Sequence, residues 1–443
     1  MSVTQALAKE ILSTSFEDVP RPAINRLKRL FVDHVGITYM GHRATGQALT
    51  AYAKEVSGRP EALLIGTKDR VSCEIAAAVN AQVCRNTDFE DSGPGLHPGP
   101  LITHTAHAVA QRVGCSGKDM LTAMAIGHDL NCRFFAASKA GPDIRHNNMV
   151  AAAIAARLLG FDQEQVGRAL SVAWEFPIKS INYTGPKVDK RITALGMGNI
   201  FSVRAGLQAA LMTAHGFESV PDEIDQMGDQ YDLDKLVDHS ARFEETQRNL
   251  FLKPWPTSHM CHMVVQSIEE LVDENDLQPD DIISIKAGLP NVYLMPHQNN
   301  PHPARYWEAI YSTAWAFAMA VHRVPSGPDW FTDERIADAV CHATADKVEI
   351  VEDTAATAAY QALDLPAVDG WVEIKSTKGD LARSRTLNDT WGSPATPMPD
   401  DIFHGKFMRV TEPSLGTVGA QTLYDALQDI ENCGAVSDIS ALM

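Results

Sequence analysis

The hydrophobic pattern changes its period part-way along this chain of 443 residues, and this change limits the possible folds most strongly. Up to about residue 265 the chain is rich in Ala, and apolar residues recur every three to four positions, as in amphipathic helices. The pattern predicts helices over 22–41, 75–83, 101–113, 119–130, 148–159, 164–173 and 198–214.

After about residue 272 the pattern alternates with a period of two, which is typical of strands. It predicts strands over 281–287, 347–351 and 370–375, a hairpin that turns at 378–380, and one helix over 304–321. A Pro-rich link over 393–401 precedes a last helix at 423–430. We therefore expect a mainly α protein in two parts: a discontinuous helical domain (1–265 and 398–443) and a smaller, inserted α+β domain (266–397).

The charge balance excludes polyanionic partners. The chain carries 56 acidic and 38 basic residues, a formal net charge of −18. Nucleic acids and anionic lipid surfaces require a basic face, so we expect neither as a partner. An anionic substrate would need a local cluster of cations.

Three features predict a reduced, cytoplasmic protein. No apolar run reaches the ~18 residues of a membrane span. The first ten residues, MSVTQALAKE, lack the pattern of a signal peptide. The seven cysteines are scattered and odd in number, without a CxxC pair.

The common cofactor motifs are absent from the sequence. The segment 196–201 lacks the third glycine of a dinucleotide loop, and there is no P-loop, HExxH or GxSxG motif. The Gly-rich stretch 93–100 contains three prolines, which cannot donate backbone hydrogen bonds to a phosphate. The sequence therefore predicts no cofactor.

An acidic cluster is the first candidate site. Asp88, Glu90 and Asp91 lie within four residues, and His97 follows in the Pro/Gly-rich stretch. Crowded carboxylates raise one another's pKa, so Asp88 is a candidate general base and His97 its partner acid. The alternative is a solvated acidic helix end.

Three further clusters carry cations or histidines. Residues 145–148 (Arg-His-Asn-Asn) precede an apolar helix and either bind a carboxylate or cap the helix. In the segment 252–262, two prolines hold Lys253 rigidly, while His259, Cys261 and His262 lack a fourth zinc ligand at matching spacing, so we predict no metal. The segment 183–191 brings three cations together, either as a solvated loop or as the expected local cluster: Lys187, Lys190 and Arg191.

Taken in order, these clusters resemble the MmgE/PrpD family, which includes 2-methylcitrate dehydratase, cis-aconitate decarboxylase and iminodisuccinate epimerase. Six segments carry the resemblance: 29–41 (R-x3-D-x2-G, with Arg29, Asp33 and Gly36), 80–92 (ending DFEDS), 127–133, 145–160, 252–262 (LKPWP and a later His) and 303–318.

The resemblance implies a homodimer of two-domain subunits with the site between the domains. It implies reactions on small di- and tricarboxylates without a metal or organic cofactor. By position, it assigns catalytic or binding roles to Asp88, Ser92, His97, His146, Lys253 and His262.

Several positions depart from the family pattern. Ser92 replaces a Thr, Glu90 replaces an Asp, and Trp315 stands where many members have Tyr. The Lys-Pro-Leu-His segment of the dehydratases and decarboxylases has no counterpart at 195–198, so we expect a substrate other than methylcitrate or cis-aconitate.

The shared chemistry is loss of a proton or of CO2 at a carbon next to a carboxylate, which requires positive charge over the substrate. We predict a dehydratase-like lyase in which Asp88 or His146 takes the proton and His97 or His262 returns one. Lys253 completes the catalytic set, and the substrate is expected to contact Ser92, Arg145, Lys187, Lys190, Arg191 and Trp315. The alternatives are an epimerase of an amino- or imino-polycarboxylate, a decarboxylase, and a non-catalytic binding protein. The presence of an acid–base set argues against a non-catalytic binding protein.

Overall fold

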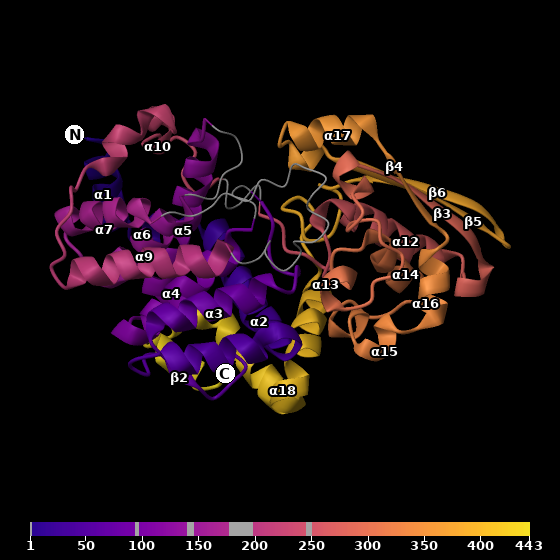
Figure 1. The fold of residues 1–443 in the computed structure, drawn as a ribbon, viewed down its shortest axis with the longest axis horizontal. Helices are drawn as coiled ribbons and strands as arrows, with labels where there is room; N and C mark the ends of the chain where they lie inside the picture. Colours follow the sequence, from indigo (N-terminus) through magenta and orange to yellow (C-terminus); the bar gives the residue numbers. More distant parts are fainter. Residues whose placement is uncertain (1, 94–96, 140–145, 177–197, 245–249) are drawn as a thin grey trace.

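The computed structural model describes residues 2–93, 97–139, 146–176, 198–244 and 250–443. They form a helical lobe and a smaller lobe built around a four-stranded sheet, which lie side by side in Figure 1. The helical lobe contains α1 (Val3–Ser13), α2 (Arg21–Val56), β1 (Ala62–Leu63), β2 (Arg70–Val71), α3 (Cys73–Arg85), α4 (Gly99–Val113), α5 (Gly117–Ala137), α6 (Asn147–Leu158), α7 (Gln163–Glu175), α9 (Gly198–Ala214), α10 (Leu233–Leu236) and, from the end of the chain, α18 (Asp400–Gln428) and α19 (Val436–Ser440).

The second lobe contains α12 (His262–Glu274), β3 (Ile282–Leu289), α13 (Tyr306–Ala309), α14 (Thr313–Val321), α15 (Asp333–Ile336), α16 (Ala339–Ala345), β4 (Val348–Glu352), α17 (Thr354–Gln361), β5 (Asp369–Ser376) and β6 (Gly379–Thr386). The strands lie in the order β4-β3-β5-β6. Only the β3–β4 pair is parallel, so the chain must cross over between these strands, and α13 to α16 form that crossover.

Small residues explain how the helices of the first lobe lie so close together. Along α6 the run from Met149 to Ala156 is almost completely buried. At Gly41 of α2, a Cβ atom would collide with the carbonyl oxygen of Val83 in α3. The Ala-rich pattern therefore reflects close helix packing, and each helix predicted in this part lies within an observed one, except that the predicted 148–159 extends one residue beyond α6.

The main differences from the sequence-based expectation have local causes. The helix expected over 304–321 is split into α13 and α14, because the Ser312 hydroxyl accepts a hydrogen bond from the backbone N–H of Trp315 (3.0 Å) and caps a new helix. The hairpin turns at 377–378, since β5 ends at Ser376 and β6 begins at Gly379.

Two hydrophobic cores underlie the two lobes, and the chain returns to the first at its end. Phe403 and Phe407 of α18 belong to the same core as α2, whereas β3, β5 and α14 share the second core. The predicted fold class, mainly helical with a smaller α+β part, is confirmed, while the domain boundaries stay predictions. Among the described helices, none has the length and apolar character that a membrane span requires.

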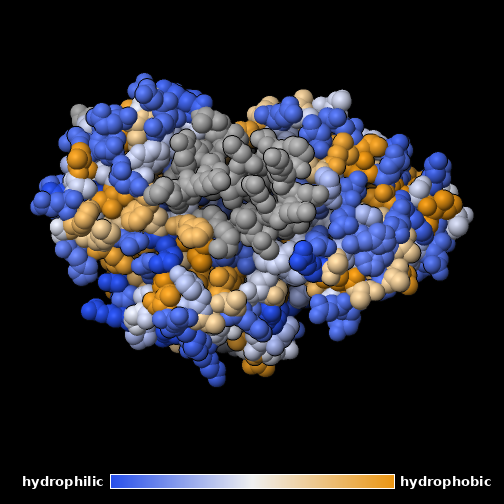
Figure 2. Space-filling view, viewed as in Figure 1, coloured by the Kyte–Doolittle hydropathy of each residue, from blue (hydrophilic) through white to orange (hydrophobic). Residues whose placement is uncertain are grey.

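Hydrophilic residues cover much of the described surface in Figure 2, and apolar residues gather both in the band where Figure 1 places α9 and α3 and over parts of the second lobe. Phe201 of α9 is 58% exposed.

Candidate active site

The acidic segment leaves helix α3 through an unusual backbone turn. Asp88 adopts a left-handed conformation (φ 46°), which Asp tolerates better than most residues. The Thr87 hydroxyl donates to the carbonyl of Cys84 (2.7 Å) and accepts from the backbone N–H of Phe89 (3.2 Å), which fixes the turn. Asp88 is only 3% exposed, so its carboxylate lies in the interior of the protein.

A short antiparallel pairing joins this segment to the distant Lys253 segment. Ser92 and Phe251 exchange two backbone hydrogen bonds (3.0 and 2.8 Å). The pairing brings Lys253 close enough to the acidic segment for its charge to act on Glu90. This contact between residues far apart in the sequence creates the site.

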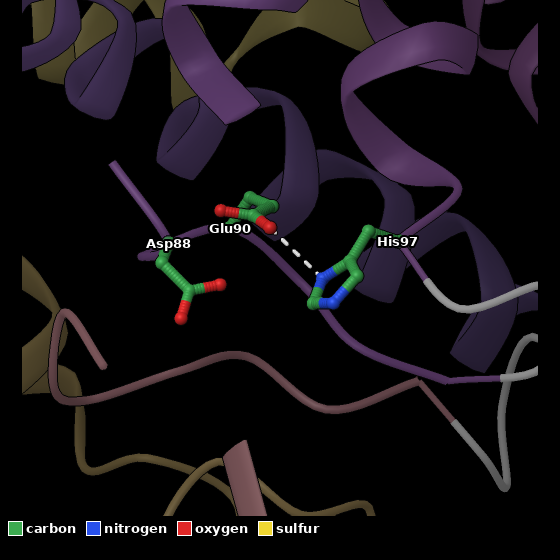
Figure 3. A group of neighbouring side chains, drawn as sticks. All are labelled: Asp88, Glu90 and His97. Carbon is green, nitrogen blue, oxygen red and sulfur yellow. Dashed lines mark ion pairs between the residues drawn. The ribbon is translucent and has the colours of Figure 1, made fainter. Parts of the chain in front are cut away.

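Five side chains form a charged network in which four are buried and His97 is partly exposed, and three of the five are drawn in Figure 3. The Lys253 ammonium donates to the Asp88 Oδ1 and main-chain oxygens, both at 2.9 Å. Arg85 Nη1 lies 3.1 Å from Asp88 Oδ1 and 2.9 Å from Glu90 Oε1. His97 Nδ1 lies 2.8 Å from Glu90 Oε1, as the dashed line in Figure 3 marks. Two carboxylates and two permanent cations give this network no net charge while His97 is neutral.

The negative charge of Glu90 helps to determine which ring nitrogen of His97 carries a hydrogen. Burial opposes the ionised form of Glu90, but Arg85, Lys253 and His97 together outweigh burial and hold the pKa of Glu90 well below its ordinary value. His97 Nδ1 also lies 3.1 Å from the carbonyl oxygen of Asp91. Since both partners of Nδ1 are acceptors, Nδ1 carries a hydrogen, and Nε2 is the nitrogen that takes up or releases a proton.

Asp88, Glu90 and His97 also offer three ligand atoms within 4.8 Å of one another. A metal ion there would compete with Arg85 and Lys253 for the same carboxylate oxygens, and both cations would repel it. These residues fit an acid–base network better than a metal site. The absence of a metal stays a prediction.

His262 lies at the start of α12, and its ring packs edge-on against Trp255 with 5.3 Å between the ring centroids. The ring centroid of His259 also lies 5.3 Å from that of His262. Burial, aided by the charge of Lys253, keeps the pKa of His262 well below its ordinary value. His259 is held neutral in the same way, by burial and then by His262 and Lys253, which keep its pKa well below its ordinary value. A histidine held neutral is a poor acid, so the geometry favours His97 over His262 as proton donor.

The other predicted residues are distributed as follows. His146 is buried before α6, stacks on Phe134 (5.5 Å) and lies 3.4 Å from Asn131, both on α5. Ser92 is buried beside the network through its backbone pairing. Four predicted cations lie outside the described residues: Arg145, Lys187, Lys190 and Arg191.

Trp315 is placed differently from the expectation. Its side chain is fully buried in the core of the second lobe, and its indole N–H donates to the carbonyl of Trp330 (3.0 Å). A side chain committed to that core is not presented to a substrate, so we remove Trp315 from the proposed site.

Sequence reasoning missed two residues that contact the site. Arg85 was not singled out, because a cation in the last turn of a helix is common. Its position three residues before Asp88 could have indicated that the two side chains pair. Tyr306 of α13 reaches across from the second lobe and donates its hydroxyl to the carbonyl of Asn86 (3.0 Å). The network therefore lies where the two lobes meet.

Family models and curated relatives match almost the whole length of this chain. Models of the MmgE/PrpD N-terminal and C-terminal domains match residues 5–229 and 255–432. Cis-aconitate decarboxylase from Homo sapiens is 24% identical over 476 residues, covering 99% of this chain and 94% of the relative. The Mus musculus enzyme of the same name is also 24% identical, over 480 residues, covering 98% and 93%. The matched ranges span both lobes, and the chain belongs to the MmgE/PrpD family.

Proposed function

We propose that the protein is a lyase that removes a proton next to a carboxylate of a small di- or tricarboxylate, in the manner of a dehydratase. The observation that carries this proposal is the buried network of Asp88, Lys253, Arg85, Glu90 and His97. A protein that only binds a ligand does not need a carboxylate base and a histidine with a fixed tautomer in one buried site.

In the proposed mechanism Asp88 is the base. Among the described residues, its contacts with Lys253 and Arg85 all go to Oδ1, so Oδ2 is the oxygen that would take the proton. Uptake of the proton raises the charge of the network by one unit, next to the carbanion that forms at the same moment. This change stabilises the transition state more than the bound substrate, which is what catalysis requires.

His97 is the proposed acid. Its Nε2 would protonate the leaving hydroxyl, while ionised Glu90 stabilises the imidazolium form and holds the ring in place. The proposed reaction needs no metal or organic cofactor. The missing Lys-Pro-Leu-His segment leads us to expect a substrate other than cis-aconitate or methylcitrate.

A decarboxylase is the second candidate, and it is favoured by the similarity to the cis-aconitate decarboxylases. In a decarboxylase the bond between carbon and the carboxylate breaks in place of the carbon–hydrogen bond, and His97 would protonate the resulting carbanion. An epimerase of an amino- or imino-polycarboxylate would use the same two groups on opposite faces of one carbon.

Proton NMR in D2O with a panel of small polycarboxylates distinguishes these reactions. We expect exchange of the α-proton together with a new vinyl signal, which indicates loss of water. Loss of CO2 would instead favour the decarboxylase, and deuterium incorporation with inversion would favour the epimerase. Measurable binding without any exchange or product would contradict all three reactions.

We also propose that the protein is a homodimer, as the family resemblance implies. Light scattering is expected to give twice the 48.3 kDa mass of one chain. A mass equal to one chain at micromolar concentration would contradict this proposal.

A further inference from the structure

The R-x3-D-x2-G motif of α2 has a structural explanation that does not involve the substrate directly. Arg29, Asp33 and Gly36 are four and three positions apart, so they share one face of the helix. That face lies against α18. Arg29 donates to the Asp400 carboxylate (2.5 Å), and a Cβ atom at Gly36 would lie 2.9 Å from the ring of Phe407.

Lys406 of α18 lies in the middle of this contact and is only 3% exposed. Its ammonium group reaches three acceptors: Asp33 Oδ1 at 2.6 Å, the Phe89 carbonyl oxygen at 3.0 Å and the Lys253 carbonyl oxygen at 2.9 Å. It also lies 3.8 Å from the centre of the Phe89 ring. An ammonium has three N–H donors, so all of them are used.

The carbonyl groups of Phe89 and Lys253 belong to the two chain segments that form the proposed site. Phe89 lies between Asp88 and Glu90, while the Lys253 side chain is the one that holds Asp88. Lys406 therefore holds the main chain on both sides of the Asp88–Lys253 contact. A buried ion pair adds little stability compared with apolar residues of the same size, so stability alone does not account for this lysine.

We infer that Lys406, oriented by Asp33, is a positioning residue that keeps Lys253 and the Asp88–Glu90 segment in register for proton abstraction. This role rests on the proposed function, but its structural part can be tested without a substrate. Through Lys406, the segment that follows the α+β lobe controls the geometry of a charged network whose five side chains all precede that lobe.

The test compares wild type with the double variant Asp33→Asn/Lys406→Met, which removes both charges and keeps similar volumes. Acylation of lysines, followed by mass spectrometry, measures how well Lys253 is protected; in the wild type its side chain is 0% exposed. We expect labelling of Lys253 to become at least about tenfold faster in the folded variant. With a substrate from the panel, kcat should fall about 100-fold and KM should change little, as for a displaced catalytic group.

The control is Arg29→Met, which weakens the same contact between α2 and α18 without touching the carbonyls of Phe89 or Lys253. It should leave the labelling of Lys253 and kcat close to wild type. Asp33→Asn alone is a milder version of the test if the double variant unfolds, and it should raise labelling of Lys253 several-fold. The inference would be overturned if Lys253 were as well protected in the folded variants as in the wild type. It would also be overturned if Arg29→Met raised the labelling of Lys253 as much as the double variant does. If the wild type turns over no acid in the panel, the proposed function fails, while the labelling result still decides the role of Lys406.

Discussion

Replacing Asp88 by Asn should lower kcat by about 10⁴-fold and also abolish exchange of the substrate's α-proton in D2O. The amide has nearly the same size as the carboxylate but cannot take a proton from carbon. The network would also carry an extra positive charge before the reaction, so the gain in charge that stabilises the carbanion would be lost. Single-turnover kinetics and NMR exchange measure the two effects separately.

The fold should survive this substitution. Asn adopts the left-handed conformation of residue 88 as readily as Asp does. Lys253 would keep the main-chain oxygen of residue 88 as an acceptor and Glu90 as a nearby negative charge, so we expect a loss of stability of about 1–3 kcal/mol.

Thermal unfolding checks this stability, and Asp69→Asn is a matched control, because Asp69 pairs with Lys54 at the surface. If Asp88→Asn kept more than about a tenth of the wild-type kcat, another residue, such as His146, would be the base.

Much of the helical lobe could be predicted because its signal is local. Helix α9 has the predicted bounds, Gly198–Ala214, since apolar residues recur at helical spacing along its whole length. Helix α2 continues to Val56, beyond the expected end near residue 41, because exposed polar residues in its second half weaken the apolar pattern. The break at Ser312 was not foreseen, because a serine next to a helix start looks the same as a serine inside a helix until its hydrogen bonds are known.

The site was predicted less completely, since most of it depends on contacts between distant segments. Asp88, His97 and Lys253 could be named from their motifs, but only the pairing of Ser92 with Phe251 brings Lys253 beside the acidic segment. Arg85 and Lys406 carry no motif of their own, and burial next to carboxylates is what reveals them.

Trp315 was assigned to the site from its motif, although the direction of its side chain was unknown. Its position in a motif was clear, but a motif does not tell which way a side chain points, and this one points into a core.

Replacing His97 by Gln should separate the two halves of the proposed reaction. We expect kcat for product formation to fall about 10³-fold, because no acid remains to protonate the leaving group. Exchange of the α-proton with D2O should continue, since Asp88 can still remove that proton and return a deuteron. This result would differ from that of Asp88→Asn, which should lose both product formation and exchange. Loss of exchange in His97→Gln would mean that His97, and not Asp88, is the base.

Glu90→Gln provides the matched control, because it keeps the shape of the network and removes only the charge that faces His97 Nδ1. The pKa of Glu90 lies well below its ordinary value, so Glu90 is ionised at every pH at which the enzyme would be assayed. Without that charge the imidazolium form of His97 is less stable, so a weaker interaction supports the proposed acid. The value of kcat should therefore fall about 10-fold to 100-fold. An unchanged kcat would show that Glu90 does not support His97, and the proton donor would then have to be sought among the other histidines near Lys253.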